Sequence, residues 1–205
     1  MGLAARPRRL GLFGGAFDPP HRAHVALAQL ALQQLALDEL RILPTGHAWH
    51  KQRPLTPAPQ RLAMARLAFA ELPGAVLDER ETQRPGPTYT VDTLRELQAE
   101  QAGAQCYLLL GADQLAALPQ WHEYRQILQA ATIVLAERTA LTPDTLAHVA
   151  LLEQAGARVQ RLALPAMPIS SSMVRARLSQ AQDITDLVPE PVARYIASHR
   201  LYLHT

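Results

Sequence analysis

Short apolar runs alternate along the chain with longer segments in which apolar residues recur at helical spacing. The short runs, which are bounded by turn residues, predict strands at residues 10–13, 40–43, 75–77, 106–110, 132–136 and 159–162. The periodic segments predict helices at residues 23–35, 60–72, 90–100, 122–129, 142–154, 171–181 and 191–199. Residues 45–59 contain Pro54, Pro57 and Pro59 and are predicted to form a loop.

Strands that alternate with helices predict βαβ units and a parallel sheet that carries helices on both faces. We expect one domain over residues 1–205, with a helical C-terminal part at about 169–205 and a peripheral insertion at 139–156. In such a fold, ligands bind beyond the carboxyl ends of the strands. The chemically unusual residues indeed follow predicted strands, at 14–24, 47–51, 111–113 and 170–172.

Composition narrows the class of protein. The chain has 205 residues, of which 48% are hydrophobic and 19% are charged, and this excludes disorder as its main description. It has no run of about 18 apolar residues, so we expect no membrane span. A net charge of +2 does not indicate a nucleic-acid partner. The single cysteine, Cys106, excludes an internal disulfide framework, and without a signal-peptide pattern we expect a cytoplasmic protein. Oligomeric state is left open.

The turn after the first predicted strand contains Gly14 and Gly15 and then, at the start of a helix, His21 and His24. Glycines let the backbone approach an anion, and a helix N-terminus offers unpaired N–H groups. Histidines three residues apart lie on one face of the first helical turn, so this segment predicts a site for phosphate oxygens. The alternatives are an ordinary turn with two surface histidines or a zinc pair, although no Cys or acidic cluster completes a zinc site.

Three serines open a later predicted helix and form a second candidate. Ser170, Ser171 and Ser172 can cap that helix, or they can present hydroxyl and N–H groups to a phosphate, with Arg175 one turn further on. Lys51 is the only lysine of the chain and follows the second strand. It is either a solvated surface residue or a compact cation that binds phosphate.

Asp113 and Trp121 follow the strand at 106–110. An Asp just beyond a strand can accept hydrogen bonds from a ribose, and a Trp at the start of a helix can stack on a heteroaromatic ring. Trp121 can equally be a core residue, and Cys106 is most simply a small buried side chain.

Taken together, the segments Gly14–His24 and Ile169–Arg175 resemble the signatures of the HxGH nucleotidylyltransferase superfamily. Within it, the chain is similar to bacterial nicotinate-nucleotide adenylyltransferases over nearly its whole length, and least so at 139–164. The resemblance implies a Rossmann-like nucleotidyltransferase fold and the transfer of AMP from ATP to nicotinate mononucleotide, which gives deamido-NAD and pyrophosphate. Two residues depart from the usual pattern, because Ala23 stands where Gly is usual and Ala16 where Thr is usual.

The resemblance also assigns roles. It implies that four donors neutralise phosphate charge, namely His21, His24, Lys51 and Arg175. It places ATP at Gly14, Gly15, Phe17, Ser170, Ser171 and Ser172, and the mononucleotide at Thr88, Tyr89, Asp113 and Trp121. We expect Mg²⁺ to arrive with ATP, bridging its phosphate oxygens, and we assign no metal-ligating residues.

There are three alternatives to this activity. Nicotinamide mononucleotide or phosphopantetheine can serve as the acceptor in related chemistry, and a module of this kind can bind ATP without turning it over. The phosphopantetheine reading leaves the Trp121 segment without a role. The binding-module reading leaves the two histidines and Lys51 without one.

Overall fold

The computed structural model of the chain describes residues 6–46, 54–137 and 142–203. Within them, one sheet has the strand order β3-β2-β1-β4-β5-β6, and every neighbouring pair is parallel. Its strands are β1 (Arg9–Gly15), β2 (Glu39–Pro44), β3 (Ala75–Leu77), β4 (Gln105–Gly111), β5 (Ala131–Glu137) and β6 (Val159–Ala163). The predicted parallel α/β fold is confirmed.

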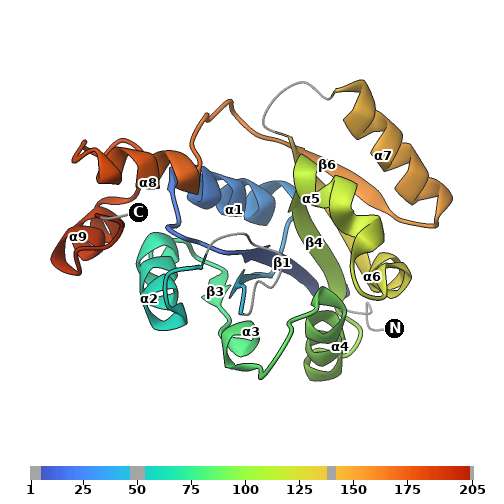
Figure 1. Ribbon diagram of the computed structural model, residues 1–205. Helices are drawn as coiled ribbons and strands as arrows, with labels where there is room; N and C mark the ends of the chain where they lie inside the picture. Colours follow the sequence, from blue (N-terminus) through green and yellow to red (C-terminus); the bar gives the residue numbers. More distant parts are fainter. Residues whose placement is uncertain (1–5, 47–53, 138–141, 204–205) are drawn as a thin grey trace.

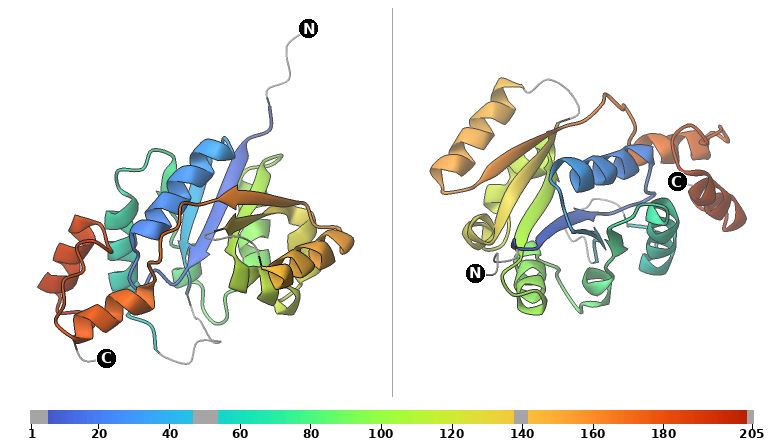
Figure 2. Two further views of the ribbon diagram at one scale, coloured as in Figure 1. Left: turned by 90° about the horizontal axis from the view of Figure 1, so that it is seen from above. Right: turned by 180° about the vertical axis from the view of Figure 1, so that it is seen from behind.

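The helices connect these strands and form a second group at the C-terminus. The connecting elements are α1 (Arg22–Gln34), α2 (Ala58–Phe69), α3 (Arg80–Gln83), α4 (Thr90–Glu100), α5 (Ala112–Ala117), the short 3-10 helix η1 (Leu118–Gln120), α6 (Tyr124–Ala130) and α7 (Pro143–Gln154). The last two, α8 (Ser171–Ser179) and α9 (Glu190–Ser198), lie at the end of the molecule near α2, whereas α7 lies at the opposite end (Figures 1 and 2).

Two apolar clusters show that the sheet is covered on both faces. Alternate residues of β1 point to opposite faces, so Phe13 packs with α1 and α2 while Leu12 packs with α4, α5 and α6. The C-terminal helices add Val174 and Val192 to the first cluster. Cys106 belongs to the second cluster, and burial raises the pKa of its thiol to about 11. It is therefore the small buried side chain that its apolar strand predicted.

The order in which strands are added to the sheet reverses between β1 and β4. The strands β1, β2 and β3 progress toward one edge of the sheet, and β4, β5 and β6 progress toward the other. In a parallel sheet the crevice at such a switch, beyond the carboxyl ends of the strands, is where ligands bind. The turn that follows β1 lies at this point.

All predicted strands and helices are present, with boundaries that differ by a few residues. Helix α2 begins at Ala58 inside the predicted loop, because a proline is tolerated in the first turn of a helix. Three short elements, α3, α5 and η1, are too brief to show a helical period and were not predicted.

The segment at 139–156 corrects a prediction. It was expected to be a peripheral insertion, but α7 is the crossover between β5 and β6, and its Leu152 is buried in the second cluster. No helix among the described residues has both the length and the apolar character needed to cross a membrane.

Candidate active site

The turn between β1 and α1 holds its two histidines against each other. His21 is the N-cap of α1, and its backbone N–H donates to Nδ1 of His24 over 3.2 Å. The rings are stacked, with centroids 3.6 Å apart and planes 20° from parallel. Because Nδ1 of His24 accepts this hydrogen bond, the neutral ring carries its own proton on Nε2, which makes that nitrogen a hydrogen-bond donor. This is the form suited to a phosphate oxygen.

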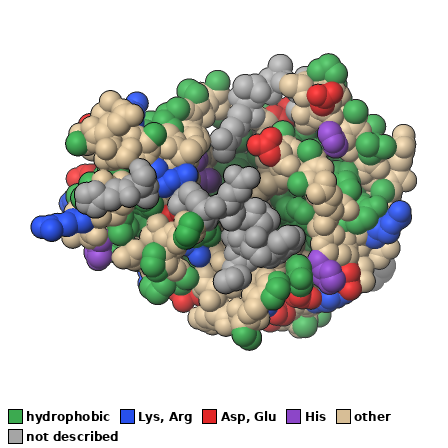
Figure 3. All heavy atoms as spheres, viewed as in Figure 1, with side chains coloured by type: hydrophobic (Ala, Val, Ile, Leu, Met, Phe, Trp, Pro, Cys, Tyr) green, Lys and Arg blue, Asp and Glu red, His purple; other side chains and the backbone are tan. Residues whose placement is uncertain are grey.

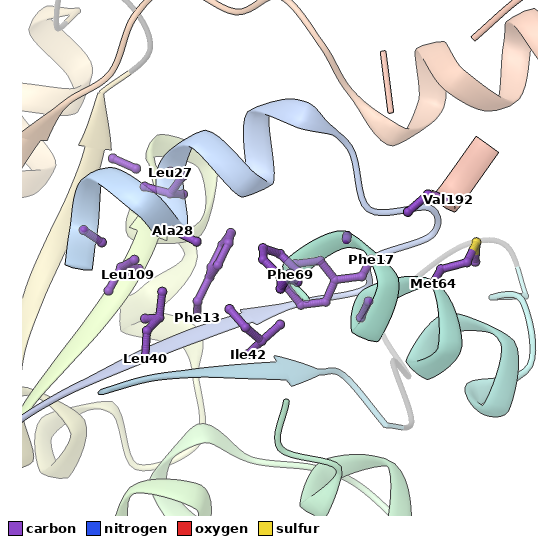
Figure 4. Packing of buried hydrophobic residues seen from close by; sticks show 14 of the residues in the cluster. Phe13, Phe17, Leu27, Ala28, Leu40, Ile42, Met64, Phe69, Leu109 and Val192 are labelled. Carbon is purple, nitrogen blue, oxygen red and sulfur yellow. The ribbon is translucent and has the colours of Figure 1, made fainter. Parts of the chain in front are cut away.

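Phe17 anchors the same turn in the core. Its backbone is left-handed, with φ 47°, and its ring is 1% exposed. The ring packs edge-on against Phe69 of α2, with centroids 5.7 Å apart (Figure 4). It also packs edge-on against the His24 ring, with centroids 5.1 Å apart. A Cβ on Gly15 would lie 3.2 Å from the Phe17 ring, so the glycine makes room for it. Phe17 was assigned to ATP, but with its ring buried only its backbone can face a ligand.

The start of α8 meets this turn, although more than 150 residues separate the two in sequence. The Ser171 hydroxyl donates to the Pro19 carbonyl over 2.8 Å, and Nη1 of Arg175 donates to the Asp18 carbonyl over 2.6 Å. Ser170 caps α8 by accepting from the Met173 N–H at 3.2 Å, so the capping alternative holds for this serine. Basic and histidine side chains reach the surface together where α1 and α8 meet (Figure 3). The two signature segments thus form one site.

A buried polar cluster lies beneath the turn, and the sequence did not predict it. Arg61 of α2 is 2% exposed and donates to the carbonyls of Ala16 and Thr56, at 2.9 and 2.8 Å. Asp18 is 1% exposed, and its carboxylate accepts from the Tyr202 hydroxyl over 2.6 Å. Asp18 lies in the segment Gly14–His24, but no role was assigned to its side chain from the sequence. Arg61 and Tyr202 gave no signal beyond being polar residues in helical or terminal segments.

The predicted mononucleotide residues follow β3 and β4 in the chain. The ring of Tyr89 lies 4.3 Å from that of His122, and Trp121 is half-buried at the edge of the second apolar cluster. Asp113 is exposed in the first turn of α5. Trp121 therefore packs on the core without being fully buried, and both alternatives for its role stay open.

Thr88 is held by a residue that the sequence analysis left without a role. Its hydroxyl donates to the Glu81 carbonyl over 3.3 Å, and the hydroxyl of Thr93 donates to the Glu81 carboxylate over 3.0 Å. Glu81 is 8% exposed, and this burial raises the pKa of its carboxyl group to about 7. An isolated Glu in a helix of four residues carries no sequence signal of such a role.

Two further predictions concern charge and metal binding. Lys51 lies outside the described residues, so its assignment stays a prediction. Among the described residues, no group of three or more His, Cys, Asp or Glu side chains could hold a metal ion.

Fold and site together define a nucleotidyltransferase of the Rossmann-like kind, and a family model described as cytidylyltransferase-like matches residues 12–177. A protein of Albidiferax ferrireducens named probable nicotinate-nucleotide adenylyltransferase is 54% identical over 195 residues, which are 95% of this chain and 98% of that protein. A protein of the same name from Methylibium petroleiphilum is 42% identical, over 97% and 94% of the two chains. The chain belongs to the nicotinate-nucleotide adenylyltransferase family.

A solved structure supports the fold independently of close sequence similarity. The Plasmodium falciparum nicotinic acid mononucleotide adenylyltransferase complexed with NaAD has a TM-score of 0.78 at 20% identity, with 97% of this chain and 98% of that chain covered. A second structure of that protein, complexed with APC, gives a TM-score of 0.77.

Proposed function

We propose that this protein transfers the adenylyl group of ATP to nicotinate mononucleotide, giving deamido-NAD and pyrophosphate. The observation that carries this proposal is the junction of the β1–α1 turn with α8. There, the stacked histidines at the start of α1 lie next to the serine-capped start of α8 and to Arg175, at the switch point of the sheet. The family relationship supplies the identity of the acceptor.

The reaction suits a site that has donors but needs no strong base. A phosphate oxygen of the mononucleotide attacks the α-phosphorus of ATP, a new P–O bond forms, and the bond to pyrophosphate breaks. The attacking phosphate is already ionised at neutral pH, so catalysis rests on alignment and on stabilising negative charge. We assign this stabilisation to His21, His24, Lys51 and Arg175.

The ATP phosphates lie in this proposal against Gly14, Gly15 and the backbone of Phe17, with the hydroxyl and N–H groups of Ser170, Ser171 and Ser172 on the other side. Both segments contain the start of a helix, and the positive end of a helix dipole favours anions. Mg²⁺ would arrive with ATP and would neutralise negative charge on its phosphates, and we assign no residue of this chain as its ligand.

The mononucleotide lies in this proposal near the strand ends of β3 and β4. Trp121 stacks on the pyridine ring, Thr88 and Tyr89 hold the pyridine carboxylate through their backbone N–H groups, and Asp113 accepts from a ribose hydroxyl. The half-buried Trp121 and the exposed Asp113 are both suited to these contacts.

An assay of pyrophosphate release tests the proposal. Purified protein with MgATP is given nicotinate mononucleotide, nicotinamide mononucleotide, phosphopantetheine or no acceptor. We expect the highest kcat/KM with nicotinate mononucleotide. A higher value with either other acceptor would change the substrate. ATP binding by calorimetry without release under any condition would favour the non-catalytic module.

A further inference from the structure

Tyr202, which follows α9, reaches into the buried cluster beneath the candidate phosphate site. It is 6% exposed, and its hydroxyl donates to Oδ1 of Asp18 over 2.6 Å across 184 residues of sequence. Its backbone is left-handed, with φ 65°, a conformation that a residue other than Gly adopts at a cost. The chain therefore bends after α9 in a way that turns this ring inward.

The Tyr202 hydroxyl supplies a hydrogen-bond donor to a carboxylate that is buried in the turn. Asp18 is almost completely buried, and a buried carboxylate is costly unless donors surround it. The Thr56 N–H lies 3.4 Å from Oδ2, a long contact, whereas the Tyr202 contact is short. Burial, followed by the hydrogen bond to Asp18, raises the pKa of the Tyr202 phenol, so the hydroxyl stays protonated and remains a donor at neutral pH.

Other elements also form hydrogen bonds to the backbone of Asp18 and of its neighbours in the turn. Arg175 of α8 binds its carbonyl, and the guanidinium of Arg61 binds the carbonyl of Ala16, two residues earlier. Arg61 also interacts electrostatically with Asp18. The backbone between Ala16 and Pro19 is thus fixed by α2, by α8 and by the segment after α9. His21, which follows directly, begins α1 in the orientation that this backbone sets.

We propose that Tyr202 is a positioning residue for ATP, acting through Asp18 to fix the backbone N–H groups and the histidines of the β1–α1 turn. This inference rests on the proposed function. It makes the C-terminal segment part of the phosphate site although Tyr202 itself touches no substrate.

The test is the conservative variant Tyr202→Phe, which keeps the ring and removes only the hydroxyl. We expect kcat/KM for ATP to fall about tenfold, mainly through KM, while KM for nicotinate mononucleotide stays within about twofold. Tyr195→Phe is the matched control, because Tyr195 in α9 stacks on His199 at 3.9 Å and its hydroxyl makes no hydrogen bond within the described residues. This control should match the wild type.

A second measurement needs no activity. Hydrogen–deuterium exchange of peptides that span residues 14–24 should be faster in Tyr202→Phe than in the wild type or in Tyr195→Phe. In an Asp18→Asn background, the Tyr202→Phe change should have a smaller effect on exchange, because the partner has already changed. Unchanged exchange in the turn, or KM values that rise equally for both substrates, would overturn the proposal. An inactive wild type whose turn still responds to Tyr202→Phe would instead contradict the proposed function alone.

Discussion

The phosphate end and the acceptor end of the candidate site are built differently. Residues 17–21 of the phosphate turn are buried, and the turn is bonded to α2, to α8 and to Tyr202 after α9. The acceptor residues Thr88, Tyr89 and Trp121 are all half-buried, and ring contacts and a threonine bond hold them at the edge of the core. The difference indicates that the phosphate end is preorganised, whereas the acceptor end can adjust to the ring that it binds.

Each end also contains buried charged residues, and two of them, Arg61 and Glu81, are compensated differently. Arg61 has two carbonyl acceptors and the nearby Asp18 carboxylate. Glu81 has the Thr93 hydroxyl, and burial dominates the environment of its carboxyl group. Buried charges are tolerated when they are paired and hydrogen-bonded. We therefore expect the burial of Glu81, at the acceptor end, to make the stability of the fold depend on pH.

The largest effect should come from the phosphate end. His24→Ala removes a donor to charge that develops in the transition state, so kcat should fall about 10²–10⁴-fold. Steady-state rates of pyrophosphate release measure this. His148→Ala, at a half-buried position of α7 at the opposite end of the molecule from α8, is the control and should retain full activity. Because the His24 ring also packs on Phe17, thermal unfolding must show that the variant is folded. Turnover near the wild-type rate would remove His24 from catalysis.

The next effect is a dependence of folding stability on pH, which arises from Glu81 at the acceptor end. The pKa of Glu81 is raised from its usual 4.5 to about 7, so the folded state binds more protons than the unfolded state between these values. Stability from this group is full below pH 4.5 and is lost as pH rises through 7. Since one pKa unit corresponds to about 1.4 kcal/mol, the loss is about 3 kcal/mol. The charged groups that act on Glu81 are Arg84, Asp78 and Arg80.

Glu81→Gln tests this effect, because the amide oxygen can still accept from Thr93 but cannot ionise. The free energy of unfolding, measured by urea titration from pH 4.5 to 8.5, should fall less steeply with pH in the variant than in the wild type. Glu153→Gln, at an exposed position of α7, should leave the wild-type profile unchanged. Parallel profiles for the wild type and Glu81→Gln would show that the buried carboxyl group does not drive the pH dependence.

Trp121 gives a smaller, selective effect at the acceptor end. Trp121→Ala should raise KM for nicotinate mononucleotide about tenfold and KM for ATP much less, because stacking on the pyridine ring is lost. Trp121→Phe keeps an aromatic face and should lie between the wild type and the Ala variant. If both KM values rise equally and the melting temperature falls, Trp121 acts as part of the second apolar cluster instead.

The sequence predicted the strands and the two signature segments of this site, but it did not predict the buried polar contacts that hold them. Short apolar runs located the six strands of the described residues, and the signal is strongest in β1, β4 and β5, because most of their residues are buried. The glycine turn and the serine run were found because their composition is unusual for a strand end and a helix start. The junction between them, through Ser171 and Arg175, agrees with the prediction that they form one site.

Contacts such as Tyr202 with Asp18 could not be predicted, because one hydroxyl and one carboxylate 184 residues apart carry no local pattern. The short helix α3 hid Glu81 for a related reason. Four residues are less than the length over which a helical period can be recognised, and the burial of Glu81 depends on α4. The sequence therefore does not predict the environment of a residue when a different helix or a distant segment forms that environment.

The smallest effect concerns the departure at Ala16, where the family usually has Thr. Ala16 is half-buried in the phosphate turn, and its carbonyl already binds Arg61, so only the side chain is changed by substitution. Ala16→Thr adds one hydroxyl beside the proposed phosphate position, and a hydrogen bond of this kind contributes about 1 kcal/mol. We expect KM for ATP to fall about fivefold with kcat nearly unchanged. Ala16→Val has the shape of Thr without the hydroxyl, so it separates the hydrogen bond from the added volume. A gain in both variants would assign the effect to packing, and a gain in neither would show that this turn binds ATP through its backbone and histidines alone.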